Sequence, residues 1–289
     1  MLGRLFVIGA SFAMAAPVMA QSAANPIVAD MPRDAAHPAR LEQVRYPTGG
    51  VQVPARLFIA AGAGPHPTVL LLHGFPGTEL NLDLARVLQR SGWNVLAIHY
   101  RGMWGSPGPF SFGNTIEDAH AAIAWLRSPA AAEFGVDTKR IVVVGHSMGG
   151  FDAAMLGDDA QLAGYVLISP ADVTKLFSAP VTQKARAGFA QSAVSINATL
   201  DSVTADVRTH GAQWDWAKRA GQMKGRPVLV LTSDDGLAPV GEAAAQAASA
   251  AGGPKAMIVH MTTDHSFNDQ RVALATTVLD WLMRNFARP

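Results

Sequence analysis

Residues 145–149, Gly-His-Ser-Met-Gly, form a segment that could supply a nucleophile. The segment follows an apolar run at 141–144 and precedes a predicted helix over 148–156. A tight turn between a strand and a helix strains the backbone of Ser147, and the flanking glycines let neighbouring chain pass without side-chain clashes. The hydroxyl then stands exposed at the start of a helix, where it can attack a carbonyl carbon. The alternative is a serine that only caps the helix.

A serine hydroxyl is a weak nucleophile at neutral pH and requires two partners. A neutral histidine must lie within hydrogen-bond reach to remove the proton. A carboxylate must hold the tautomer of this imidazole and balance the positive charge that develops on it. The chain contains nine histidines and 22 acidic residues, so the choice depends on the elements that bring distant residues together.

Six apolar runs bounded by turn residues predict strands. They are rich in Val, Leu and Ile with almost no polar alternation, which is typical of strands covered on both faces. The runs are 68–73, 93–99, 141–145, 165–169, 227–232 and 255–261. Helical stretches lie between and after them, at 79–90, 115–127, 148–156, 241–250 and 270–287. This alternation of strand and helix predicts a parallel sheet in an α/β fold.

Two segments depart from the alternation. Residues 45–46 and 51–60, on either side of the turn at 48–50, predict an antiparallel hairpin at one edge of the sheet. Residues 171–226 separate two predicted strands where a single helix would suffice, so we expect an insertion of a few short helices over the carboxyl edge of the sheet. The length and the even composition of the chain favour one large domain.

With the motif at 145–149 in this setting, the chain resembles the α/β-hydrolase superfamily, and the resemblance extends from Val44 to the end. Leu-Leu-His-Gly-Phe-Pro-Gly at 71–77 is similar to the strand-end His-Gly segment of that superfamily, and Tyr-Arg-Gly at 100–102 matches a common turn. The resemblance implies an α/β fold with a mostly parallel, eight-stranded twisted sheet, helices on both faces and a short helical cap at 171–226.

The resemblance also implies an oxyanion hole. In the superfamily one donor is the backbone N–H of the residue after the His-Gly pair, which here is Phe75. The second donor is the backbone N–H of the residue after the nucleophile, which here is Met148. The two N–H groups would bind an oxygen that becomes anionic only in the transition state. The Phe75 side chain could at the same time be a core aromatic.

The base and the acid follow from the same resemblance. The superfamily places its base after the last strand, which indicates His265, and a solvated loop histidine is the alternative reading. The acid follows the preceding strand and commonly has a proline four residues later, which indicates Asp235 because Pro239 stands at that distance. Asp234 would take this role if the loop differs by one residue. The chain order of Ser, Asp and His is that of the superfamily.

Apolar residues near these motifs could line an acyl pocket. Trp104 lies in the apolar loop 103–110, and Trp214 and Trp216 lie in the insertion. For each of these residues a position in the core is an equally good interpretation.

Composition excludes several other classes of site. Lysine and arginine number 23 against 22 acidic residues, so the chain has no positive field to attract nucleic acid. The chain has no cysteine, which excludes thiolate zinc sites, iron–sulfur clusters and cysteine nucleophiles. No spacing of the His-x-His or His-Glu-x-x-His kind is present, so we expect neither a metal nor a cofactor.

The first twenty residues predict a secretory signal peptide. Arg4 precedes an apolar run of about twelve residues, and Val-Met-Ala at 18–20 then meets a polar pair. The run is too short to cross the hydrocarbon layer as a helix, although an uncleaved anchor or a buried helix is the alternative. We therefore expect a signal at 1–20, a loosely held arm at 21–43 and a hydrolase domain at 44–289. The mature protein would be exported without stable membrane insertion.

The sequence thus predicts a serine hydrolase that cleaves carboxylic esters of small or aryl substrates through an acyl-enzyme. An exported peptidase of the prolyl-oligopeptidase-like kind would use the same machinery on short peptides. It would need an acidic pair for the substrate ammonium, and the spacing of Asp172, Asp201, Asp206 and Asp215 marks none. A cofactor-free perhydrolase shares the nucleophile motif. A non-catalytic binding protein on the same scaffold is the alternative outside the enzyme class.

Overall fold

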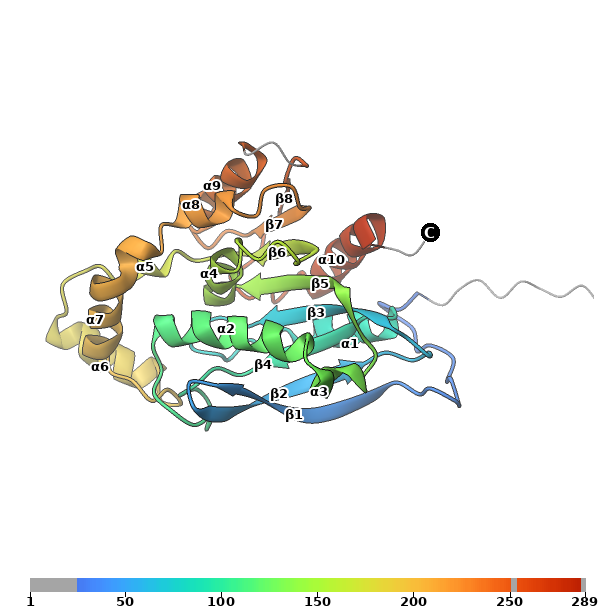
Figure 1. Cartoon of the computed structure of the whole chain (residues 1–289). Coiled ribbons are helices and arrows are strands. Elements are labelled where there is room, and N and C mark those ends of the chain that lie inside the picture. Colours follow the sequence, from blue (N-terminus) through green and yellow to red (C-terminus); the bar gives the residue numbers. More distant parts are fainter. Residues whose placement is uncertain (1–24, 251–253, 287–289) are drawn as a thin grey trace, which may run out of the picture.

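The structure, a computed structural model, describes residues 25–250 and 254–286. Within these residues eight strands form one sheet in the order β1-β2-β4-β3-β5-β6-β7-β8 (Figure 1). The strands are β1 (Arg40–Thr48), β2 (Val51–Ile59), β3 (His66–Leu72), β4 (Asn94–Ile98), β5 (Val136–His146), β6 (Gly164–Ile168), β7 (Val228–Thr232) and β8 (Met257–His260). β2 runs antiparallel to β1 and β4, and all other pairs are parallel. The predicted α/β fold with a mostly parallel, eight-stranded sheet is therefore confirmed.

Helices cover both faces of this sheet (Figure 1). α1 (Leu82–Arg90) and α10 (Arg271–Phe286) pack on one face. The other face carries α2 (Phe112–Leu126), the short α3 (Pro129–Ala132), α4 (Met148–Met155), α8 (Trp216–Gly221) and α9 (Ala238–Ala250). Successive side chains along a strand point to opposite faces of the sheet, so helices on both faces bury both sets of side chains in the central strands. In β3, Leu70 and Leu72 face α2 and α4, whereas Val69 and Leu71 belong to the core beneath α1 and α10.

The sequence-based boundaries differ from the structure at a few places. β1 begins at Arg40, so the last residues of the predicted arm pair with β2 in the sheet. β5 begins at Val136, five residues before the apolar run at 141–145, because its first half is partly exposed and lacks the apolar signal. α9 begins at Ala238 rather than at Gly241. The predicted signal segment, 1–20, lies outside the described residues.

The inserted segment forms the predicted cap. α5 (Val173–Leu176), α6 (Gln183–Ser192) and α7 (Leu200–His210) lie beyond the carboxyl ends of the strands (Figure 1). The 3-10 turn η1 (Gly211–Gln213) then leads to α8, which returns to the face of the sheet. There the indole Nε1 of Trp216 donates a hydrogen bond of 3.0 Å to the carbonyl of Val240 in α9. Only the first three helices thus cover the carboxyl edge.

The cap is tied to the loop after β4 by backbone hydrogen bonds. The N–H of Trp104 donates to Ser195 O at 2.8 Å, and the N–H of Asn197 donates to Gly102 O at 2.7 Å. Phe110 N–H donates to Asn197 O at 3.1 Å. These bonds fix residues 195–197, between α6 and α7, to the body of the protein.

A buried acid lies in the helix that follows Ser147. Asp152 in α4 is fully buried, and its Oδ1 accepts a hydrogen bond of 2.8 Å from Thr115 Oγ1 in α2. Burial raises the pKa of Asp152 to about 8, because an ionised carboxylate there would lose its hydration. The folded protein therefore holds this carboxyl group protonated at neutral pH.

Asp152→Asn should remove one source of pH-dependent stability. Between about pH 4 and pH 8 the folded protein binds a proton at Asp152 that the unfolded chain has released, so the free energy of unfolding of the wild type falls as the pH rises. The asparagine amide is neutral throughout. Relative to the wild type, the variant should gain about 1 kcal/mol per pH unit from pH 5 to pH 8 in urea unfolding. A difference between the two proteins that does not change with pH would contradict the assignment.

Candidate active site

Ser147 occupies a strained turn between β5 and α4. Its backbone has φ 57° and ψ −117°, a region that non-glycine residues rarely adopt. The turn is possible because its glycines meet backbone directly: a Cβ on Gly145 would lie 2.0 Å from Gly149 O, and a Cβ on Gly149 would lie 2.1 Å from Leu72 O. Any side chain at either position would push Ser147 away from the end of β3.

The segment after β3 lies against Ser147, where the oxyanion hole is predicted. A Cβ on Gly74 would be 2.8 Å from Ser147 Cβ and 3.3 Å from Ser147 Oγ. Phe75, the next residue, donates no hydrogen bond from its backbone N–H within the described residues. Met148 begins α4, and the first N–H groups of a helix have no intrahelical acceptor. The N–H groups of Phe75 and Met148 thus come from the two segments that flank Ser147, and their role as oxyanion-hole donors stays a prediction.

His265 pairs with Asp235. Its Nδ1 lies 2.6 Å from Asp235 Oδ2, and the Asp235 side chain is only 6% exposed. Burial raises the pKa of Asp235, but hydrogen bonds from His265 and from the N–H of Leu237 outweigh burial, so its pKa lies below the usual value. The neighbouring Asp234 instead contacts Nε2 of His260 at 3.1 Å. Of the two carboxylates that the sequence left open, only Asp235 contacts His265.

His265 lies beside the nucleophile turn, and His146 holds it there. The rings of His146 and His265 have their centroids 4.8 Å apart, and His146 Nε2 lies 2.9 Å from the backbone oxygen of His265. Burial, then the nearby His265 and Arg271, lower the pKa of His146 to about 4, so it is neutral at pH 7 and Nε2–H donates this bond. Because Nδ1 of His265 is hydrogen-bonded to Asp235, Nε2 is the ring nitrogen that could accept a proton from a nucleophile.

No hydrogen bond joins Ser147 Oγ to His265 among the contacts of the described residues. Such contacts are often long in the absence of substrate and tighten in the complex. The loop that carries His265 is fixed by a second contact, from Nη1 of Arg271 to Ser266 O at 2.9 Å. Arg271 in turn pairs with Asp83 of α1, so the loop is connected to the face of the sheet that carries α1 and α10.

The two tryptophans of the predicted acyl pocket lie in different environments. Trp104 is 49% exposed, and its indole Nε1 donates a hydrogen bond of 3.0 Å to Pro76 O in the segment that supplies Phe75. Trp214 is buried and packs edge-on against Phe151, with ring centroids 5.9 Å apart. Trp104 therefore borders the candidate site, whereas Trp214 lies in the core, the alternative interpretation of its sequence position.

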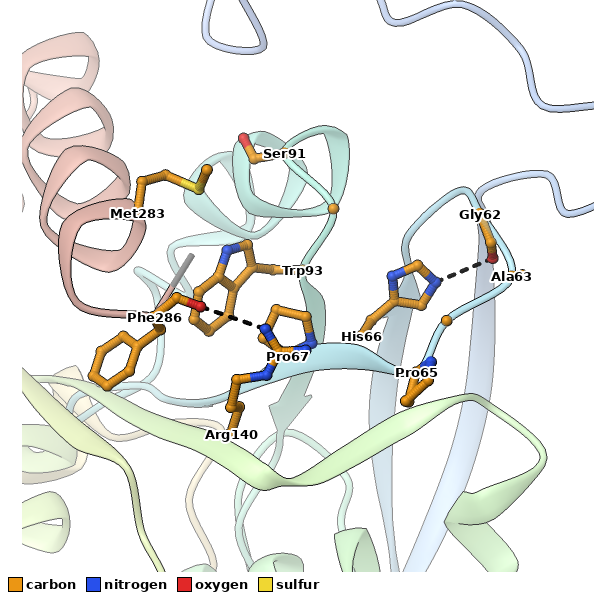
Figure 2. Close-up of a pocket in the computed structure, with 12 residues that line it drawn as sticks. Gly62, Ala63, Pro65, His66, Pro67, Ser91, Trp93, Arg140, Met283 and Phe286 are labelled. Carbon is orange, nitrogen blue, oxygen red and sulfur yellow. Dashed lines mark hydrogen bonds between the residues drawn. The ribbon is translucent and has the colours of Figure 1, made fainter. Parts of the chain in front are cut away.

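A separate cavity of about 380 Å³ lies at the amino-terminal ends of β3 and β4, away from Ser147 (Figure 2). Trp93, His66, Arg140 and Phe286 line it. The guanidinium of Arg140 pairs with Asp137 at 2.7 Å and also donates to Phe286 O. Because this cavity is at the opposite edge of the sheet, it takes no part in chemistry at Ser147.

Neither a cluster of metal-binding side chains nor a membrane-spanning helix is found in the described ranges, 25–250 and 254–286. No group of three or more His, Cys, Asp or Glu side chains there could hold a metal ion. No helix in those ranges is both long and apolar enough to cross a membrane.

Residues 69–278 match the model of the alpha/beta hydrolase family, and the chain belongs to that family. Over 104 residues it is 35% identical to the carboxylic ester hydrolase LipN of Mycobacterium tuberculosis, covering 34% of this chain and 27% of LipN. Over 130 residues it is 28% identical to the esterase EstD of Thermotoga maritima, covering 41% of this chain and 30% of EstD. The chain thus spans less than a third of the length of these relatives.

Solved structures show the same fold. The structure of EstE1, a thermophilic and thermostable carboxylesterase cloned from a metagenomic library, is similar with a TM-score of 0.60 at 24% identity. The similarity covers 85% of this chain and 90% of EstE1.

Sequence reasoning missed two side chains that support the candidate site. The first is His146, which the motif itself contains and whose position directly before Ser147 was the available signal. The second is Ser169, buried after β6 with φ 36°. Its hydroxyl lies 2.9 Å from Ser233 Oγ, and its side chain helps to lower the pKa of Asp235. No pattern in the sequence marks Ser169.

His146→Phe should slow the reaction of Ser147 with a fluorophosphonate probe roughly tenfold. The variant keeps a buried ring but loses the donor to His265 O, and one such hydrogen bond contributes about 1 kcal/mol or slightly more. His146→Gln retains an N–H donor at a similar reach and should recover most of the rate. The measurement is the second-order rate of labelling, with thermal unfolding as a control. Equal rates for the Phe and Gln variants would contradict the role assigned to His146.

Proposed function

We propose that the protein hydrolyses carboxylic esters through an acyl-enzyme on Ser147. The observation that carries this proposal is the 2.6 Å contact of His265 with the buried Asp235, on a loop held against the strained turn of Ser147. A strained serine beside an imidazole that a carboxylate orients is the arrangement needed for nucleophilic attack on a carbonyl. Relatives that are named ester hydrolases support the same reaction.

In the first step Ser147 Oγ attacks the ester carbonyl carbon while Nε2 of His265 takes the hydroxyl proton. The carbonyl oxygen becomes an anion and accepts hydrogen bonds from the N–H groups of Phe75 and Met148. Asp235 remains ionised and stabilises the imidazolium. His265 then protonates the departing alcohol, which leaves the acyl group on Ser147. Water then attacks the acyl carbon while His265 takes its proton. The ester bond to Ser147 Oγ breaks, His265 returns the proton to this oxygen, and the carboxylic acid leaves.

Esters of small or aryl substrates are preferred over peptides in this proposal, because a peptidase that holds a free ammonium needs an unengaged carboxylate. The four aspartates of the insertion already have partners. Asp201 pairs with Arg186 at 2.7 Å, and Asp206 accepts a hydrogen bond from Gly113 N–H and contacts His210. Asp172 and Asp215 cap α5 and α8. The cap therefore offers no acidic pair for a substrate amine among these four.

The proposal includes export of the mature protein, with residues 1–20 removed as a signal peptide. The support is the charged start, the short apolar run and the small residues before Gln21 in the sequence. Amino-terminal sequencing of the protein from the medium or periplasm tests it, and a mature chain that begins at Met1 would contradict it.

Ser147→Ala tests the reaction. The variant should fold as the wild type does, since the smaller side chain leaves the turn intact, but kcat on p-nitrophenyl acetate should fall at least about a thousandfold. Aminoacyl p-nitroanilides, assayed with the wild type in parallel, should be turned over poorly. Wild-type activity in the alanine variant would exclude Ser147 as the nucleophile, and faster turnover of the anilides would favour the peptidase.

Asp235→Asn and Asp234→Asn form a matched pair. Only Asp235 contacts His265, so its variant should lose at least about a hundredfold in kcat, because the amide cannot balance the imidazolium. The Asp234 variant loses a contact with His260 and should retain kcat within about twofold. A larger loss at Asp234 than at Asp235 would reverse the assignment of the acid.

A further inference from the structure

His73 is a buried histidine outside the proposed triad. It follows the last residue of β3 and directly precedes Gly74 and Phe75, and it is only 2% exposed. Burial is the main cause that lowers the pKa of His73 to about 4, because a charged imidazole there would lose its hydration. At pH 7 the ring is therefore uncharged and carries a single proton on one of its two nitrogens.

The backbone oxygen of Gly74 decides which nitrogen carries this proton. His73 Nδ1 lies 2.8 Å from Gly74 O. A carbonyl oxygen accepts hydrogen bonds and donates none, so Nδ1 bears the hydrogen that joins the two atoms. Nε2 is then the bare nitrogen, and it has no hydrogen-bond partner among the described residues. The ring thus directs its one donor to a backbone carbonyl.

Gly74 O and the N–H of Phe75 belong to the same peptide group. This group is planar, and in its trans form the C=O and N–H bonds point in opposite directions. A hydrogen bond that fixes the carbonyl therefore also fixes the direction of the Phe75 N–H. The bond from His73 polarises the amide as well, which makes the Phe75 N–H a stronger donor. A contact at Gly74 O thus acts on the group that is predicted to bind the oxyanion.

The ring of His73 is itself held in place. It packs edge-on against Tyr100, with ring centroids 4.8 Å apart, and Tyr100 Oη lies 3.4 Å from His73 O. Gly77 leaves room for the ring, because a Cβ at that position would lie 3.0 Å from His73 Cε1. Packing therefore holds the Nδ1–H donor beside Gly74 O.

We propose that His73 is a positioning residue for the oxyanion hole: its Nδ1–H holds the peptide group between Gly74 and Phe75 so that the Phe75 N–H points to the substrate's carbonyl oxygen. The assignment rests on the proposed function, because it requires attack by Ser147 on a carbonyl carbon. His73 touches neither the substrate nor the reacting atoms. The carbonyl oxygen becomes anionic only in the transition state, so loss of this donor lowers kcat and leaves KM nearly unchanged.

His73→Leu and His73→Asn form a matched pair. Both lose the ring and its packing on Tyr100, but the asparagine Nδ2–H stands as many bonds from the backbone as Nδ1 does and can still donate to Gly74 O. With p-nitrophenyl acetate, His73→Leu should lower kcat at least about tenfold with KM within about twofold, and His73→Asn should keep at least about a third of the wild-type kcat. Equal losses of kcat in the two variants would overturn the proposal.

His99→Leu is a control for a change of packing. The His99 ring centroid lies 6.0 Å from that of His73, and His99 Nδ1 has no hydrogen-bond partner among the described residues. The substitution removes a neighbouring imidazole without removing the bond to Gly74 O, so kcat should stay within about twofold of the wild type. A loss as large as that of His73→Leu would assign the effect to packing and overturn the proposal.

A pair of inhibitors separates the oxyanion hole from a general loss of structure. An aryl trifluoromethyl ketone adds to Ser147 Oγ while His265 takes the hydroxyl proton, and its carbonyl oxygen becomes an oxyanion. The corresponding alcohol binds without adding. In His73→Leu the inhibition constant of the ketone should rise by the factor by which kcat/KM falls, and that of the alcohol should stay within about twofold. An unchanged constant for the ketone would contradict the assignment.

The wild type alone provides a test that requires no variant. Nitrogen NMR of the protein with isotope-labelled histidine should show hydrogen on Nδ1 of His73 and a bare Nε2 from about pH 5.5 to about pH 8. The signals are assigned through their couplings to the backbone of His73. A hydrogen on Nε2 instead would leave Gly74 O without this donor and overturn the proposal, whatever the variants do.

Failure of the proposed function would look different from failure of the positioning role. A wild type that hydrolyses no ester and leaves Ser147 unlabelled by a fluorophosphonate would remove both. Ester hydrolysis with labelled Ser147, but with equal kcat in His73→Leu and His73→Asn, would remove only the role of His73.

Discussion

The candidate site depends on direct contact between backbone and backbone at the nucleophile turn. Gly149 packs on the carbonyl of Leu72 at a distance that admits no Cβ, and Gly145 packs on Gly149 in the same way. These contacts bring the amino end of α4 against the end of β3. They place Ser147, Met148 N–H and the Gly74-Phe75 segment within one small volume. The strained backbone of Ser147 persists because the surrounding sheet and helix fix both of its neighbours.

His265 and its loop are held from three directions. Asp235 holds the ring at Nδ1, His146 holds the backbone oxygen of His265, and Arg271 holds the next residue along the loop. Burial keeps His146 uncharged at pH 7, and its Nε2–H donates to the backbone oxygen of His265. In the proposed reaction, the positive charge on His265 would lie between the ionised Asp235 and the uncharged ring of His146.

The sequence was informative where a local pattern determines structure. Continuous apolar runs predicted the central strands correctly, because a strand that is buried on both faces needs apolar side chains at nearly every position. The Gly-x-Ser-x-Gly spacing predicted the turn that carries Ser147. Proline at 239 distinguished Asp235 from Asp234, and the structure has only Asp235 in contact with His265. The cap was harder to predict. Trp214 reads equally well as a pocket or a core residue, because short helices have no preferred face until tertiary packing decides it.

The backbone hydrogen bonds of residues 195–197 hold one part of the cap to the body of the protein more firmly than the other. Those residues are joined to the loop after β4 as strand is joined to strand, and α7 follows them directly. α6, by contrast, buries only Phe189 and presents most of its surface to solvent. The stretch from α5 to α6 is therefore the less firmly held part of the cap, and residues 195–197 are its fixed end. The stacked contact between Phe189 and Phe75 joins this part of the cap to the segment after β3.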